Sequence, residues 1–141
     1  MRAILIDPVT QTVTVVDYSG DYREIYALLS DKDHGLDVTA FDCVRLNATD
    51  AIYIDDNGLL NDPKYFFMWK GYAQPLAGRG LILATDVEGE TIGTNLNLKW
   101  VARQVSFGKF KVQGFEHGAY DREDGMHVIW NRPVFGPAEG E

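Results

Sequence analysis

The sequence predicts a single α+β domain, in which a mixed or antiparallel sheet carries two helices and ends in a C-terminal β-hairpin. Short stretches in which β-branched or apolar residues alternate with polar ones are separated by turn residues, which is typical of strands. Two other stretches repeat apolar residues at spacings of three and four, which indicates amphipathic helices. With 141 residues, of which 45% are hydrophobic and 24% charged, the chain is long enough for one buried core. We expect residues 1–132 to form the domain and residues 133–141 a flexible tail.

The N-terminal part predicts a hairpin followed by a helix. Residues 2–6 and 12–17 have the composition of strands, and Pro8 favours a turn between them because it fixes φ and lacks a backbone donor. Asp21 followed by Glu24 resembles a capping box, which marks the start of a helix. One face of that helix would be formed by Tyr22, Ile25, Tyr26 and Leu29.

The rest of the chain predicts further strands, to about six to eight in all, and a second helix. Strands are expected at residues 38–46, 51–54 and 81–85, a helix at 96–105, and a closing hairpin from residues 109–115 and 126–130 around the polar segment 116–125. Asn57 and Gly58 predict a tight turn with positive φ at both central residues. The aromatic run 65–69 (YFFMW) is expected to fill a core or an interface.

The candidate binding loop comprises residues 74–80 (QPLAGRG). Its two glycines permit backbone shapes barred to other residues, so that free N–H groups could cradle an anion, and its arginine could grip a phosphate or carboxylate through two hydrogen bonds. The predicted ligand-binding residues are Gln74, Gly78, Arg79, Gly80, Trp69 and Tyr72. The alternative is a plain turn that enters the next strand. Because a strand follows rather than a helix, the loop is not a dinucleotide fingerprint.

No group of residues has the spacing of a catalytic or metal site, so the sequence predicts no catalytic residue, no metal ligand and no cofactor. Cys43 is the single cysteine and lies in an alternating apolar run, so it is interpreted as a buried structural thiol. Asp55 and Asp56 are interpreted as turn residues, with acid–base chemistry as the alternative. His117 and His127 could face each other across the closing hairpin, without further ligands at a zinc spacing.

The formal net charge of −8 is unevenly placed along the chain. Residues 1–63 contain 12 acidic and 4 basic residues, whereas residues 64–141 contain 9 of each. Nucleic acid is therefore not an expected partner, and the acidic half could meet a basic protein or simply keep the chain soluble. The acidic segment 31–37 is expected to be a solvated loop. Residues 91–111 contain four basic residues and no acid, which could serve charge complementarity within the chain or self-association between copies.

The distribution of apolar residues also bears on where the chain is found. No stretch approaches the roughly 18 consecutive apolar residues of a spanning helix. The first residues lack the apolar length of a signal peptide, and a lone cysteine is consistent with a reducing compartment. We therefore expect a cytoplasmic protein without a membrane partner.

Three motifs lie in the middle of the chain: Asp-x-Gly-Leu-Leu at residues 56–60, Pro-Leu-Ala-Gly-x-Gly-Leu at 75–81, and Thr-Asp-x-x-Gly-Glu at 85–90. Together they resemble a family of small uncharacterised proteins of phages and related mobile elements. The resemblance covers roughly residues 1–105, and the C-terminal segment departs from the shorter members. It implies a role in the cytosol of a host cell and says almost nothing about activity.

Three functions follow as hypotheses. The first is a non-enzymatic, phage-type accessory protein that binds a host factor, with a possible anti-defence role. The second is a small-ligand module that binds or sequesters an anionic nucleotide at the loop 74–80. The third is a hydrolase, which would require Asp55, Asp56, His117 or His127 to converge in the fold. A homo-oligomer is a further possibility if the aromatic run 65–69 is exposed.

Overall fold

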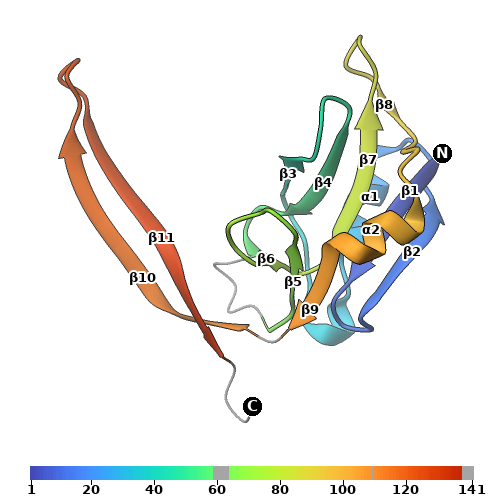
Figure 1. Ribbon diagram of the computed structural model, residues 1–141, viewed down its shortest axis with the longest axis horizontal. Coiled ribbons are helices and arrows are strands. Elements are labelled where there is room, and N and C mark those ends of the chain that lie inside the picture. Colours follow the sequence, from blue (N-terminus) through green and yellow to red (C-terminus); the bar gives the residue numbers. More distant parts are fainter. Residues whose placement is uncertain (59–63, 109, 138–141) are drawn as a thin grey trace.

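A large antiparallel sheet organises the chain in a computed structural model, which describes residues 1–58, 64–108 and 110–137 (Figure 1). Its strand order is β2-β1-β7-β4-β3, and the short strand β8 pairs with the end of β7. The bounds are β1 Arg2–Asp7, β2 Thr12–Asp17, β3 Phe41–Arg45, β4 Asp50–Asp55, β7 Gly80–Thr85 and β8 Thr91–Ile92. The predicted α+β class is confirmed, with more strands than expected.

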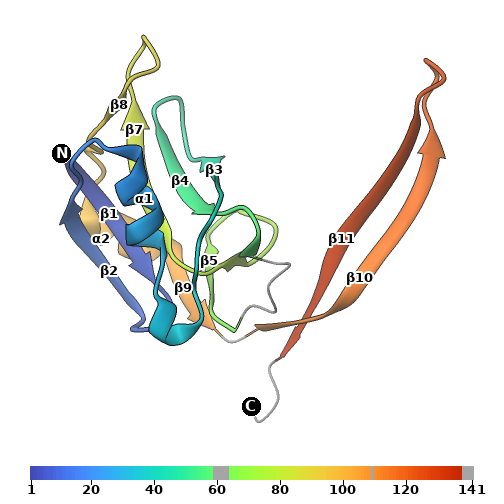
Figure 2. The same ribbon diagram turned by 180° about the vertical axis from the view of Figure 1, so that it is seen from behind.

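Two helices cover opposite faces of this sheet. Helix α1 (Tyr22–Leu29) lies behind β7 in Figure 1 and in front of it in Figure 2, whereas α2 (Leu98–Gln104) does the reverse. Strand β7 is therefore covered on both sides, which explains its uninterrupted apolar run. Helix α1 begins where predicted, because the side chain of the N-cap Asp21 accepts a hydrogen bond from the backbone N–H of Arg23.

Each face of the sheet has its own hydrophobic cluster. The cluster on the α1 side contains Ala3, Tyr18, Ile25, Leu29, Val38, Leu81 and Leu83. The cluster on the α2 side contains Ile4, Ile6, Ile52, Phe67, Trp69, Leu76, Ile82 and Val101. Neighbours along β1 and β7 enter opposite clusters because successive side chains of a strand point to opposite faces.

A second, three-stranded sheet packs into the cluster on the α2 side. Its order is β6-β5-β9, with bounds β5 Phe66–Trp69, β6 Leu76–Ala77 and β9 Val105–Gly108. Phe66 and Phe67 are fully buried and Trp69 is 8% exposed. The prediction that the aromatic run fills a core is confirmed. A homo-oligomer was considered only if this run were exposed, and the burial of its rings removes that reason.

The C-terminal hairpin extends away from both sheets, as both views show. Its strands are β10 (Phe110–Asp121) and β11 (His127–Pro137), and they are joined by a tight turn in which Gly125 has φ +87°. We call this hairpin the β10–β11 arm. At its base, the rings of Phe66 and Phe135 meet edge to face with centroids 5.7 Å apart.

The arm is longer than the sequence predicted. The polar segment 116–125 was expected to be a loop, but its first part belongs to β10. Strand β11 continues to Pro137, past the predicted domain boundary at residue 132, while residues 138–141 of the predicted tail lie outside the described residues. The charged residues pair across the hairpin, which lets a polar sequence remain in a strand.

Two local predictions are wrong, and the predicted second helix is present with shifted ends. Cys43 is exposed, because β3 is an edge strand with an open face. Within the described part of the chain, neither Asn57 nor Gly58 has positive φ; the turn is instead held by Asp55, whose Oδ1 accepts a hydrogen bond from the N–H of Asn57 at 3.0 Å. The second helix begins later than expected, at Leu98, where the side chain of Asn97 caps it by accepting from the N–H of Trp100.

No helix among the described residues is long and apolar enough to cross a membrane.

Candidate functional site

Arg79 ties three segments of the fold together. Its Nη1 donates to the carbonyl oxygens of Leu28 (3.3 Å) and Ser30 (2.8 Å) at the end of α1. Its Nη2 lies 3.1 Å from Asp7 Oδ2 at the end of β1 and 3.2 Å from Asp31 Oδ2. The side chain is only 18% exposed. The guanidinium thus satisfies carbonyl groups that a helix end leaves without partners, and an anion would have to compete with these four acceptors.

The two glycines of the predicted binding loop meet different structural requirements, one of backbone conformation and one of packing. Gly78 has φ +76°, a backbone conformation that favours glycine. Gly80 is needed for close packing, since a Cβ there would lie 2.7 Å from Cζ of Phe67 and 2.9 Å from Cγ2 of Ile52. Gln74 is half-buried in the connection between β5 and β6. Of the four loop residues predicted to bind a ligand, Gly78 alone borders a described cavity, next to Ala77.

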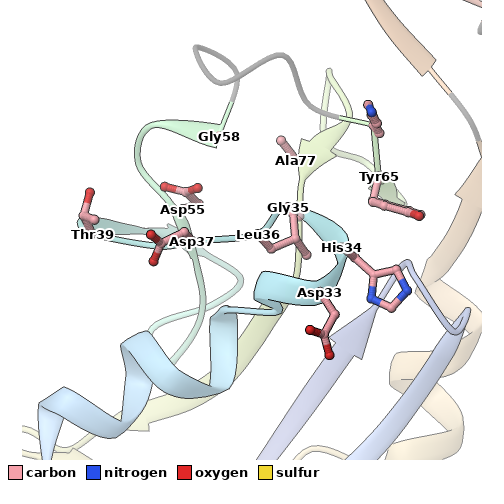
Figure 3. Close-up of a pocket in the computed structure, with 12 residues that line it drawn as sticks. Asp33, His34, Gly35, Leu36, Asp37, Thr39, Asp55, Gly58, Tyr65 and Ala77 are labelled. Atoms are coloured by element: carbon pink, nitrogen blue, oxygen red, sulfur yellow. The ribbon is translucent and has the colours of Figure 1, made fainter.

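That cavity is large and acidic, with a volume of about 850 Å³. Its lining residues are Asp33, His34, Gly35, Leu36, Asp37, Thr39, Asp55, Gly58, Lys64, Tyr65, Ala77 and Gly78. Figure 3 shows the carboxylates of Asp37 and Asp55 beside each other, whereas Asp33 points away from them. We call it the acidic cavity. Three carboxylates against one lysine and one histidine make it unsuited to the anionic ligand that the sequence predicted.

The pKa values of two carboxyl groups are shifted in this region: Asp55, which lines the cavity, and Asp31, which contacts the lining residue His34. Burial raises the pKa of Asp55, and the charges of Asp56 and Asp37 add to the increase, while the hydrogen bond from Asn57 opposes it. The pKa of Asp31 is lowered, mainly by its hydrogen bond with Nδ1 of His34 at 2.9 Å. The segment 31–37 is solvated as predicted, with residues 32–35 and 37 exposed, and through a short 3₁₀ helix at Lys32–His34 it also forms one wall of the cavity.

The residues considered for hydrolysis do not meet in this cavity. Asp55 lines it, but Asp56 is exposed outside the lining. His117 and His127 lie on the β10–β11 arm, where His117 is opposite Asn131 and His127 is opposite Asp121. The sequence suggested that the two histidines could face each other across the hairpin. The strand register shows that they are not cross-strand partners. In the part of the chain that the structure describes, no three His, Cys, Asp or Glu side chains are placed to hold a metal ion.

Trp69 and Tyr72 line a different and smaller cleft, of about 340 Å³, which we call the Trp69 cleft. Its lining residues are Met68, Trp69, Lys70, Gly71, Tyr72, Arg103, Gln104, Val105 and Ser106. The structure thus divides the six predicted ligand residues: two enter this cleft, one borders the acidic cavity, and Arg79, Gly80 and Gln74 enter neither. Lys70 and Arg103 were missed, because only the pairing of β5 with β9 brings them together.

The β10–β11 arm presents apolar side chains on both faces. In the strand register, Ala119 is opposite Ile129, and these lie on one face. Gly118 opposite Trp130 and Tyr120 opposite Val128 lie on the other face. The ring of Trp130 covers Gly118, since a Cβ on that glycine would lie 2.7 Å from Cζ2 of the tryptophan.

Comparison with known proteins gives no match among family models, curated proteins or solved structures. The function is therefore inferred from this chain's own residues and their geometry.

Proposed function

We propose that the chain is a binding protein that holds a second, different protein through the β10–β11 arm. The observation that carries the proposal is the exposure of large apolar side chains on the arm. These are Phe115 (51% exposed), Tyr120 (55%), Met126 (56%), Ile129 (71%) and Trp130 (38%). Clusters of exposed apolar residues of this kind mark interaction surfaces in soluble proteins.

The arm also lacks the packing that normally stabilises strands. A two-stranded hairpin is marginally stable by itself, and a third strand or a covering surface is needed for independent stability. The contact of Phe135 with Phe66 anchors the base of the arm, but the rest extends away from the sheets (Figure 2). A protein that covers the arm would supply the missing packing.

Charge pairing on the arm indicates what kind of partner fits. Arg132 forms an ion pair with Glu116, and its guanidinium lies 5.7 Å from the ring centroid of Trp130. At the tip, Nδ1 of His127 lies 2.7 Å from Asp121 Oδ1. Because these charges are paired within the arm, they offer little to a polyanion, whereas the exposed apolar side chains and the two open strand edges remain available to a partner. Such a surface suits a protein with an apolar groove or an exposed strand, and not a phosphate backbone.

The resemblance to proteins of phages and mobile elements supports a partner in the host cell. The proposed partner is accordingly a bacterial host protein, with interference in host defence as the corresponding role. The acidic body, with 12 acidic and 4 basic residues in positions 1–63, would add attraction to a partner that is basic around its apolar groove.

The proposal is tested by binding with one substitution on the arm and one on the body. The full chain is immobilised, a protein retained from bacterial lysate is purified, and the two are titrated by calorimetry. Ile129→Glu should weaken the complex at least tenfold, because it buries an unpaired carboxylate in an apolar interface. Val87→Glu is the matched control, since Val87 is fully exposed on the β7–β8 turn, and it should bind as the wild type does.

Three results would overturn the proposal. Equal binding by Ile129→Glu and the wild type would place the interface elsewhere. If no protein retained from the lysate binds the chain again after purification, the proposed partner does not exist. Light scattering that shows a dimer in the wild type, and a monomer in Ile129→Glu, would make the partner a second copy of this chain.

A further inference from the structure

We infer that the Trp69 cleft binds a small anion that carries a flat ring, of the size of a nucleoside monophosphate. This site is separate from the β10–β11 arm and does not depend on the proposed protein partner. Trp69 and Tyr72 belong to the predicted ligand set, whereas Lys70 and Arg103 take the cationic role that the sequence predicted for Arg79.

Backbone pairing creates the cleft. Strands β5 and β9 pair with Trp69 opposite Val105, and the N–H of Lys70 then donates to the carbonyl oxygen of Gln104 at 2.8 Å. A tight turn follows, in which the N–H of Tyr72 donates to the carbonyl oxygen of Trp69 at 2.9 Å and Gly71 has φ +88°. The turn thereby places Lys70 and Tyr72 beside the last turn of α2.

The charge of the cleft is opposite to that of the protein. The chain has a net charge of −8, yet the two formally charged side chains that line the cleft, Lys70 and Arg103, are both positive. Both residues are exposed, and within the described chain no carboxylate lies within ion-pair distance of either. Residues 91–108, which include α2, contain no acidic residue. An anion is therefore the complement that this cleft lacks.

Aromatic rings form the apolar part of the cleft. Trp69 is 8% exposed and is held edge to face against Trp100, with ring centroids 6.0 Å apart, so its orientation is set by packing. Tyr72 is half-buried and lines the same cleft. A base stacked on the accessible part of the Tyr72 ring gains a favourable contact that does not depend on which base it is, while the largely buried Trp69 forms part of the apolar wall.

A hydrogen-bonding group completes the cleft. Gln104 uses its Nε2 to donate to the carbonyl oxygen of Trp100 at 3.2 Å, and its Oε1, which has no hydrogen-bond partner among the described residues, can accept from a ligand N–H. The volume of about 340 Å³ is at the small end of the range for ligand pockets, which favours a mononucleotide over a larger ligand. The acidic cavity is larger, but its three aspartates would repel the phosphate.

The test is calorimetric titration of the full chain with adenosine 5′-monophosphate, adenosine and inorganic phosphate. The monophosphate should bind, and adenosine and phosphate should each bind at least tenfold more weakly, because each offers only one of the two contacts. Lys70→Ala and Arg103→Ala should each reduce the affinity about tenfold, and raised salt should weaken binding. Lys32→Ala is the control, since Lys32 is an exposed lysine that lines no part of the cleft, and it should leave the affinity unchanged.

Two substitutions of Tyr72 distinguish a stacking contact with the ligand from a purely structural role of the side chain. Tyr72→Phe keeps a ring and should bind as the wild type does, whereas Tyr72→Ala should bind more weakly. Circular dichroism verifies that each variant is folded. Absence of binding up to millimolar monophosphate, or unchanged affinity in both Lys70→Ala and Arg103→Ala, would overturn the inference. Loss of binding in a folded Arg79→Lys variant alone would place the ligand at the loop 74–80.

Discussion

Arg79 and Asp7 form an ion pair across the α1 face of the sheet, with Nη2 and Oδ2 3.1 Å apart and both side chains largely buried. The pair joins the loop before β7 to the end of β1. Asp7 also accepts a hydrogen bond from the backbone N–H of Val9, at 3.0 Å, and so holds the turn that leads to β2. One arginine therefore links the central strand, its neighbour and the end of a helix.

Replacing Arg79 should destabilise the fold. Arg79→Ala leaves the carboxylate of Asp7 buried without its cation and removes two hydrogen bonds to carbonyl groups of α1, and we expect a loss of about 3 kcal/mol in the free energy of unfolding. Urea denaturation at neutral pH measures this loss. Arg23→Ala is the control, because its ion pair with Asp21 is exposed, and it should have little effect. Equal stability of Arg79→Ala and the wild type would show that the buried pair contributes nothing.

The ionised carboxylate of Asp55 should oppose folding at neutral pH. Its pKa is raised in the folded state, chiefly by burial, so the folded chain holds the proton more tightly than the unfolded chain does. The free energy of unfolding should then fall as pH rises from about 3.9, the unfolded value, through the raised folded pKa. Asp55→Asn should be more stable than the wild type at pH 7, with the difference lost below pH 3.9. Urea denaturation at both pH values measures this, and Glu88→Gln, at an exposed turn, is the control.

The hydrogen bond between His34 and Asp31 should be visible in the titration of the aspartate. Because that bond is the main cause of the lowered pKa of Asp31, His34→Ala should move the pKa back toward its ordinary value. A lowered carboxyl pKa stabilises the fold above the unfolded pKa, and this contribution is lost as pH falls through the folded pKa. Carbon-detected NMR of the Asp31 carboxyl measures the shift. His127→Ala, which removes a histidine paired with Asp121 on the arm, should not alter it; a change there would contradict the assignment.

The packing of Trp130 on Gly118 should control the order of the β10–β11 arm. Gly118→Ala puts a methyl group 2.7 Å from the indole ring and should displace it, which would change the fluorescence of Trp130 and speed proteolysis within the arm. Gly114→Ala is the matched control on the same strand, because its added Cβ has no atom within 4 Å. Identical proteolysis of the two variants would show that this ring contact does not order the arm.

The linings of the Trp69 cleft and of the acidic cavity could be predicted only in part, since they depend on contacts between distant segments. Trp69 and Tyr72 were identified from the sequence because aromatic residues beside a glycine are visible locally. Arg103 was not, because it joins them only when β9 pairs with β5. Asp37 was likewise brought to Asp55 by the path of the chain around the end of α1, which no local pattern records.

The amino-acid sequence alone determined four features: the α+β class, the first hairpin, the cap of α1 and the buried strand β7. Alternating side chains and helix caps act between residues that are close in sequence, so they can be recognised without the fold. Tertiary structure decided that Arg79 became an internal link and that Lys70 and Arg103 have no acidic partner among the residues that the structure describes. It also decided that the polar residues of the arm lie in strands. The physical reason is that the partner of a charge is chosen by the three-dimensional path of the chain.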